Sequence, residues 1–157
     1  MTSSGAPTVD PSRVSVVWDE GLLGYKLSED HPLHPVRLAL TMRLAPSLGV
    51  LEGIEPLVPS PAPDEEVQRI HVASYLDAVR RAPSTGEDPA HQLGTTDNPI
   101  FEGMHEASAL VCGGSIAAAR EIAEHAPSLR LGLLLEGSLL GFQTEFFDRV
   151  LLEHEDG

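Results

Sequence analysis

The segment from Tyr25 to Arg37 constrains the fold of this chain more than any other, because it joins two different kinds of predicted element. It follows a short apolar run, 14–18, whose β-branched residues favour a buried strand. It leads directly into 38–51, where apolar residues recur at helical spacing until a break near Pro46. The order strand, loop, helix is typical of an α/β fold.

Two prolines fix the loop between the strand and the helix. Pro32 and Pro35 hold the residues before them in extended conformations, and Pro35 suits the first turn of a helix. Arg37 then lies in that first turn, where a cation opposes the helix dipole. We therefore suspect a buried or functional partner for Arg37.

The following hundred residues predict mainly helices and loops. Apolar spacing and turn signals favour an edge strand over 54–59, helices over 65–70, 74–81 and 102–125, and over 82–98 a loop whose order the sequence leaves open. Ser74 is the expected N-cap of its helix, with Asp77 completing a capping box. Loops as long as 82–98 are often functional.

The two ends of the chain differ from its middle. Residues 1–12 are polar and are expected to form a disordered N-terminal tail, and 13–125 to form one partial α/β domain. Residues 126–157 form a tail that predicts an amphipathic helix. Its apolar positions are Leu139, Leu140, Phe142, Phe146, Phe147, Val150 and Leu151. Self-association through 139–151 is one expectation; packing within the chain is the other.

Composition restricts the partners of the chain. The formal net charge is −14 and there is a single lysine, so direct binding of nucleic acid is not expected. An acidic surface suits a cationic partner such as a lysine-bearing peptide, or serves solubility alone. One cysteine, Cys112, permits no intrachain disulfide, which favours a cytoplasmic location. No apolar run is long enough for a membrane span, so no membrane partner is expected.

Three segments together resemble the histone deacetylase family, in its acetoin-utilisation branch. They are the loop 25–37, the segment 93–104 with Asp97 shortly before Pro99, and the small-residue helix 113–120. The resemblance spans about 14–121. It implies the N-terminal part of an arginase/deacetylase-like α/β fold, in which helices flank an incomplete parallel sheet.

The resemblance also implies roles for three residues. Arg37 is similar to an arginine that lines the channel beside the active site, Asp97 to a rim aspartate that accepts hydrogen bonds from the substrate backbone, and Tyr25 belongs to the first loop. A surface arginine and an ordinary turn-forming aspartate remain the alternatives for Arg37 and Asp97. For His31 and His34 we expect a role in loop packing, since zinc needs three or four ligands.

The family reaction implied is hydrolysis of acetyl-lysine amides in proteins, with zinc as cofactor. The His-His and Asp-x-His segments that serve the family's catalysis and zinc binding do not occur in these 157 residues. We therefore expect no catalytic residue, no metal ligand and no cofactor in this chain. Two hypotheses follow: a truncated deacetylase that is inactive alone, or a non-catalytic interaction domain remodelled from one.

Overall fold

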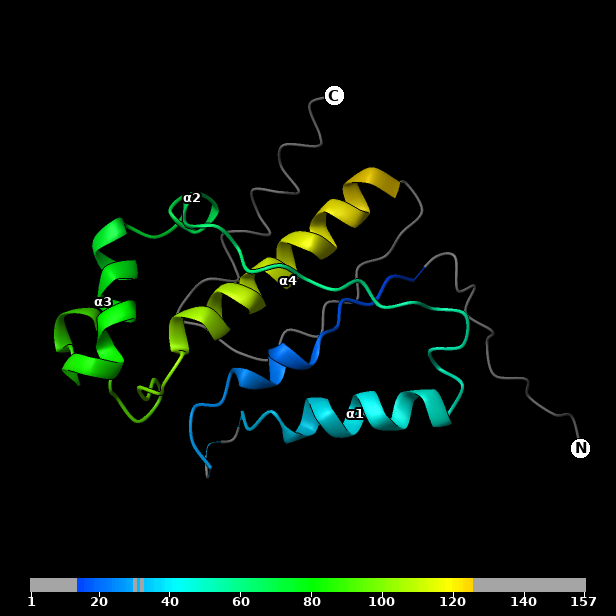
Figure 1. The fold of residues 1–157 in the computed structure, drawn as a ribbon, viewed down its shortest axis with the longest axis horizontal. Helices are drawn as coiled ribbons and strands as arrows, with labels where there is room; N and C mark the ends of the chain where they lie inside the picture. The colour runs from blue at the N-terminus through cyan, green and yellow to red at the C-terminus, as the bar shows by residue number, and fades with distance from the viewer. Residues whose placement is uncertain (1–13, 30, 32, 126–157) are drawn as a thin grey trace, which may run out of the picture.

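The structure is a computed structural model that describes residues 14–29, 31 and 33–125 (Figure 1). Its elements in chain order are the 3-10 helix η2 (Glu20–Gly24), α1 (Val36–Ser47), α2 (Asp64–Val67), α3 (Ala73–Thr85), the 3-10 helix η3 (Pro89–His91) and α4 (Met104–His125). The predictions for 1–12 and 126–157 fall outside the described residues. Within the described residues no helix is long and apolar enough to cross a bilayer.

The predicted sheet is reduced to one contact in the described residues. Val17 and Leu57 form an isolated parallel bridge, in which Trp18 N donates to the Leu57 carbonyl at 2.9 Å and Leu57 N to the Val16 carbonyl at 2.7 Å. The two segments expected as strands, 14–18 and 54–59, therefore touch in a parallel sense, but neither forms a strand in the described residues.

Helix α4 is the element against which the other segments pack. Figure 1 shows it running diagonally through the molecule, with α3 near its N-terminal end and η2 between it and α1. The element contacts agree, since α4 contacts both α3 and η2, and η2 contacts α1. Sequence predicted this helix within two residues of its observed start.

A close backbone approach fixes the segment before α2 to the middle of α4. A Cβ atom added at Gly113 would overlap the carbonyl oxygen of Ser60 and come within 3.0 Å of the Ala62 nitrogen. Ala62 N in turn donates to the carbonyl of Ala109 at 2.8 Å. Glycine at 113 thus removes the side chain that would keep this segment away from the helix.

The buried core lies between α3, the loop that follows it and the start of α4. Its members are apolar and less than a tenth exposed: Ala78, Val79, Ala82, Leu93 and Met104. Tyr75, Ile100 and Phe101 pack against this cluster. Because Leu93 and Phe101 come from the loop, the core holds the loop to both helices.

Several helix boundaries depart from the sequence prediction. Helix α1 begins at Val36, two residues early, where the His34 ring nitrogen Nδ1 accepts a hydrogen bond from Val36 N at 3.1 Å. The predicted helix 65–70 is the shorter α2, which continues as turns.

The predicted capping box of α3 is wrong. The helix starts at Ala73 with Val72 as N-cap, and no side chain caps it, so Ser74 and Asp77 lie inside the helix. It also runs four residues past the expected end, through Pro83 to Thr85, and stops at Gly86, whose φ of 82° suits glycine.

Replacing Gly113 and Gly114 separately with alanine tests the close approach. Gly113→Ala forces Ser60 away from α4 and should destabilise the chain by about 1–3 kcal/mol or more. Gly114→Ala is the matched control, since its added Cβ meets only ordinary contacts at 3.7 and 3.8 Å. It should stabilise the chain by up to ~1 kcal/mol through helix propensity. Urea denaturation followed by circular dichroism measures both, and equal effects of the two substitutions would contradict the account.

Candidate functional site

The loop between α3 and α4 carries the candidate rim residue Asp97, and it contains secondary structure of its own. Asp88 and Leu93 form an antiparallel bridge with two backbone hydrogen bonds of 3.0 Å, which closes a six-residue turn around η3. The sequence left open whether the loop 82–98 is ordered, and the structure shows that much of it is. The last turn of α3, η3 and this bridge occupy most of it.

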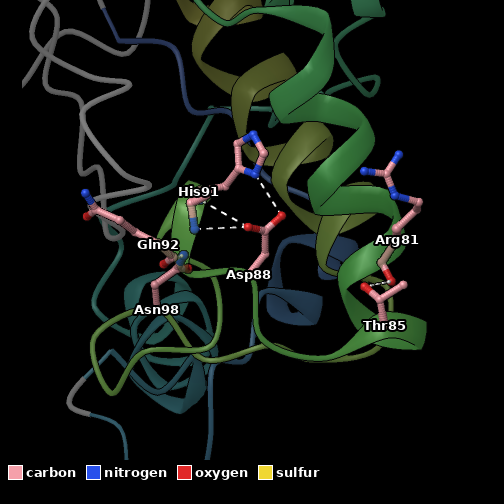
Figure 2. A network of polar contacts seen from close by, with 7 residues as sticks. Arg81, Thr85, Asp88, His91, Gln92 and Asn98 are labelled. Atoms are coloured by element: carbon pink, nitrogen blue, oxygen red, sulfur yellow. Dashed lines mark hydrogen bonds and ion pairs between the residues drawn. The ribbon is translucent and has the colours of Figure 1, made fainter.

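Asp88 caps the short helix η3 and pairs with its last residue (Figure 2). Its Oδ1 accepts hydrogen bonds from Ala90 N at 3.1 Å and His91 N at 3.3 Å, and its Oδ2 lies 2.7 Å from His91 Nδ1. The hydrogen bond from His91, with the charge of that ring and two backbone donors, lowers the pKa of Asp88. The Asp-Pro dipeptide at 88 is the sequence signal for this turn.

Asn98 is the residue that fixes the second half of the loop. It is 6% exposed, and its side-chain Nδ2 donates to the Gln92 carbonyl at 3.0 Å (both residues are drawn in Figure 2). Its backbone nitrogen donates to Thr95 Oγ1 at 3.1 Å, and its carbonyl accepts from Gly94 N at 2.9 Å. A buried amide with these partners holds the backbone on either side of it. Asn98 was not among the predicted site residues, although the Asn-Pro dipeptide is a turn signal.

Asp97 lies beside this anchor and points to solvent. Its side chain is exposed, whereas the neighbouring Asn98 is buried. The loop thus presents the Asp97 carboxylate on a backbone that the next residue holds in place. Such a carboxylate can accept two amide hydrogen bonds from an extended peptide.

Tyr25 joins the first loop to the Asp97 loop. Its ring packs edge-on against Phe101, with 5.5 Å between the ring centres and an interplanar angle of 88°. The side chain is 8% exposed, and burial together with the charge of Tyr75 raises the pKa of Tyr25 to about 12. The structure therefore places this residue in the core, beside the segment that follows Asp97.

Arg37 lies in the first turn of α1, as expected, and is exposed. Its carbonyl accepts a hydrogen bond from Thr41 Oγ1 at 2.9 Å. The structure thus joins Tyr25 to the Asp97 loop through Phe101, whereas Arg37 is positioned by a separate helix.

Four histidines of the described residues, His31, His34, His71 and His91, contribute to packing and capping. His31 Nδ1 accepts from Leu33 N at 3.1 Å, so both His31 and His34 shape the first loop, in line with the sequence interpretation. His71 stacks on Tyr75 at 5.2 Å, and Tyr75 faces His91 at 6.0 Å. Burial lowers the pKa of His71, which favours its neutral form.

Comparison with known proteins places this chain in a family. The histone deacetylase domain model matches residues 31–133, about two thirds of the chain, and the chain belongs to the histone deacetylase family. That membership implies an arginase/deacetylase-like α/β fold, of which the described residues show the helices and one parallel bridge.

Curated relatives agree with this assignment. The chain is 35% identical over 118 residues to the acetoin utilization protein AcuC of Bacillus subtilis (strain 168), covering 69% of this chain and 30% of the relative. It is 32% identical over 112 residues to AcuC of Staphylococcus aureus (strain MSSA476), covering 69% and 29%. It is 34% identical over 110 residues to AcuC of Staphylococcus xylosus, covering 68% and 29%. The chain thus spans less than a third of the length of these relatives.

The zinc ion that the family resemblance implies has no ligand set in the part of the chain that the structure describes. No group of three or more His, Cys, Asp or Glu side chains converges there in a way that could hold a metal ion. The close His91–Asp88 pair supplies two groups, and both already serve the turn around η3. No catalytic step through a metal can be assigned to these residues.

Asn98→Ala should loosen the loop while Asp97→Ala should not. Removing the Asn98 amide leaves the Gln92 carbonyl without its partner and should lower the free energy of unfolding by about 1–3 kcal/mol. Because the Asp97 side chain is exposed, Asp97→Ala should change the free energy of unfolding by less than about 0.5 kcal/mol. Chemical denaturation and hydrogen exchange of residues 92–98 measure both effects. A similar loss in the two variants would argue against Asn98 as the anchor.

The buried phenol of Tyr25 gives a pH prediction. Its folded pKa of about 12 lies above the ordinary value of 10.0, so its stabilising contribution is complete below pH 10 and is lost as pH rises toward 12. A titration followed by absorbance should show that Tyr25 ionises above pH 10, and the free energy of unfolding should fall between pH 10 and about 12. Tyr25→Phe should remove this late absorbance transition. If the transition persists in that variant, it belongs to Tyr75.

Proposed function

We propose that this chain contributes the substrate-facing loop of a deacetylase-type site for acetyl-lysine peptides. The observation that carries the proposal is the contrast between Asn98 and Asp97: the first is buried and hydrogen-bonded, the second is exposed on the backbone that Asn98 holds. Family membership supplies the class of reaction, hydrolysis of an amide on a lysine side chain.

Asp97 accepts backbone N–H groups of the peptide in this proposal. A fixed loop lowers the entropy lost when the peptide binds, because the carboxylate is already held near its binding position. The edge-on contact of Tyr25 with Phe101 supports the other side of the same loop. Tyr25 therefore positions the loop and leaves contact with the peptide to Asp97.

Arg37 is proposed to bind the carboxylate product. A guanidinium stays charged at all relevant pH values and can hold a carboxylate such as acetate through two parallel hydrogen bonds. Its place at the start of α1 and its exposed side chain leave it accessible to a small anion. This role depends on the family resemblance of the Pro35-to-Arg37 segment.

The isolated chain is proposed to be a truncated member of the family without hydrolytic activity of its own. Its sequence contains neither a His-His pair nor an Asp-x-His segment, and it spans about 30% of the length of the AcuC relatives. Without a group to stabilise charge in the transition state, amide hydrolysis would lack its main source of acceleration.

The second candidate function is that of a non-catalytic interaction domain. The observation that favours it is the apolar face of α1, on which Leu40 and Leu44 are each 56% exposed. Exposed apolar surface of this kind is common where a protein meets another surface. The two proposals differ in what the chain should bind, an acetyl-lysine peptide at the Asp97 loop or an apolar partner at α1.

Peptide binding by the 157-residue chain tests the first proposal. Titration with an acetyl-lysine peptide, followed by NMR, should shift the amide signals of the Asp97 loop. Asp97→Ala should reduce the affinity by several-fold, consistent with loss of one or two hydrogen bonds of about 1 kcal/mol each. Glu102→Ala, which removes a neighbouring exposed carboxylate, is the matched control and should leave the affinity unchanged.

Acetate release from the same peptide should stay at background. Turnover that survives repurification and is abolished by Arg37→Ala would contradict the proposed inactivity. Binding that Asp97→Ala leaves intact would contradict the proposed role of the loop.

A further inference from the structure

The loop before α1 repeats one small unit. The sequence reads His-Pro-Leu at 31–33 and His-Pro-Val at 34–36. In both units the Nδ1 atom of the histidine ring accepts a hydrogen bond from the residue after the proline, from Leu33 N at 3.1 Å and from Val36 N at 3.1 Å. Because proline has no N–H, these are the first backbone donors after each histidine. Each ring thus closes a turn as an asparagine or aspartate side chain commonly does.

The second of these turns caps helix α1. Val36 is the first residue of the helix, and its N–H is one of the donors that a helix cannot satisfy by itself. The residue before it, Pro35, makes no side-chain cap hydrogen bond, so the ring of His34 supplies the acceptor that a polar N-cap residue supplies elsewhere. Arg37 N donates to the His34 carbonyl at 3.4 Å. His34 therefore holds two successive amides of the first turn.

The cap at Val36 requires a neutral ring. A backbone N–H can only donate, so Nδ1 of His34 carries a lone pair in this arrangement, and the ring hydrogen is on Nε2, which lies 3.5 Å from Glu29 Oε2. Protonation would place a hydrogen on Nδ1, and two donors would then face each other. It would also put a positive charge at the N-terminal end of α1, which the helix dipole disfavours.

Glu29 offers the protonated ring a different partner. The hydrogen bond and charge of Lys26, together with the contact of His34, lower the pKa of Glu29, so this carboxylate is ionised at neutral and mildly acidic pH. A carboxylate at ion-pair distance favours the protonated imidazole. The ring of His34 thus has one partner for each of its two charge states.

The neighbouring charges act in opposite directions on His34. The 3-10 helix η2, which contacts α1, carries Glu20 and is capped by Asp19, whose carboxylate accepts a hydrogen bond within that cap. Helix α1 carries two arginines and no acidic residue. The acidic groups favour the protonated ring and the arginines oppose it, so Glu29, at ion-pair distance, is the partner that we assign to the charged state.

We propose that His34 is a positioning residue for the first turn of α1 and acts as a proton-controlled cap. The neutral ring holds the Val36 N–H, and the protonated ring releases it and pairs with Glu29. Histidine is the side chain that ordinarily changes charge between pH 5 and 8, so we expect the exchange of partners in this range. Because Arg37 lies in the same turn, its binding of a carboxylate would follow the same pH dependence. That consequence alone rests on the proposed function.

An NMR titration of the 157-residue chain from pH 8 to pH 5 tests the cap without any substrate or product. The Val36 amide signal should move together with the ring signals of His34, and at pH 8 the ring nitrogen signals should show hydrogen on Nε2 and none on Nδ1. A ring that carries its hydrogen on Nδ1 at pH 8, or a Val36 signal that does not follow the ring, would overturn the proposal.

Hydrogen exchange of Ala39 measures how far the first turn opens. Its N–H donates to the Pro35 carbonyl at 3.2 Å. Its protection, corrected for the intrinsic pH dependence of exchange, should fall about fivefold from pH 8 to pH 5, the factor that corresponds to loss of a cap of about 1 kcal/mol. Protection that stays constant over this range would contradict the release of the turn.

Substitutions at position 34 separate the cap from a general loss of stability. His34→Asn keeps an acceptor for the N–H two residues later but does not titrate, so Ala39 should stay protected at both pH values. His34→Ala removes the acceptor, and protection should be low at both. His31→Asn is the matched control, because it removes the other ring of the loop and should leave the pH response unchanged. A response that persists in His34→Asn, or is lost in His31→Asn, would overturn the role of His34.

Glu29→Gln tests the partner of the protonated ring. A neutral amide cannot form an ion pair with the imidazolium, so the Val36 N–H should be released at a lower pH than in the unsubstituted chain. Glu20→Gln is the matched control, since Glu20 is an exposed acidic residue of η2, and it should leave the transition in place. An unchanged transition in Glu29→Gln would contradict the exchange of partners.

Discussion

The contact of α4 with the backbone of Ser60 to Ala62 is the constraint on which the rest of this structure depends. Only glycine at 113 allows that approach, and the hydrogen bond from Ala62 N to the Ala109 carbonyl holds it. The same segment brings Leu57 beside Val17, where the single parallel bridge forms. A side chain at 113 would separate the helix from the only sheet-like pairing between distant segments in the described residues.

From this contact the position of the candidate site follows. Helix α4 begins directly after the Asp97 loop, and its first residue, Met104, is part of the core that also includes Leu93. The loop is thus attached at both ends to a packed core, and Asn98 fixes its centre. An exposed carboxylate on such a support differs from one on a loose surface loop, because its position is determined before a ligand arrives.

Structural features that depend on near neighbours in the chain could be predicted well from the sequence. Small residues and helical spacing predicted α4, and the Pro35 signal placed the start of α1 within two residues. The resemblance of 25–37, 93–104 and 113–120 was sufficient to predict the family that the domain match confirms. The capping box at Ser74 was wrong because burial of Leu76, Val79 and Ala82 sets the position of α3, whereas a capping side chain contributes only about 1 kcal/mol.

The sequence by itself determined the family, the helices and the identity of the candidate residues Tyr25, Arg37 and Asp97, since these depend on local spacing and on motifs in order. Only the tertiary structure decided that the 82–98 segment closes on itself, that Tyr25 is a core residue packed on Phe101, and that the apolar side of α1 faces outward. The physical reason is that burial and hydrogen bonding between segments far apart in the chain depend on which surfaces meet. No local pattern of residues carries that information.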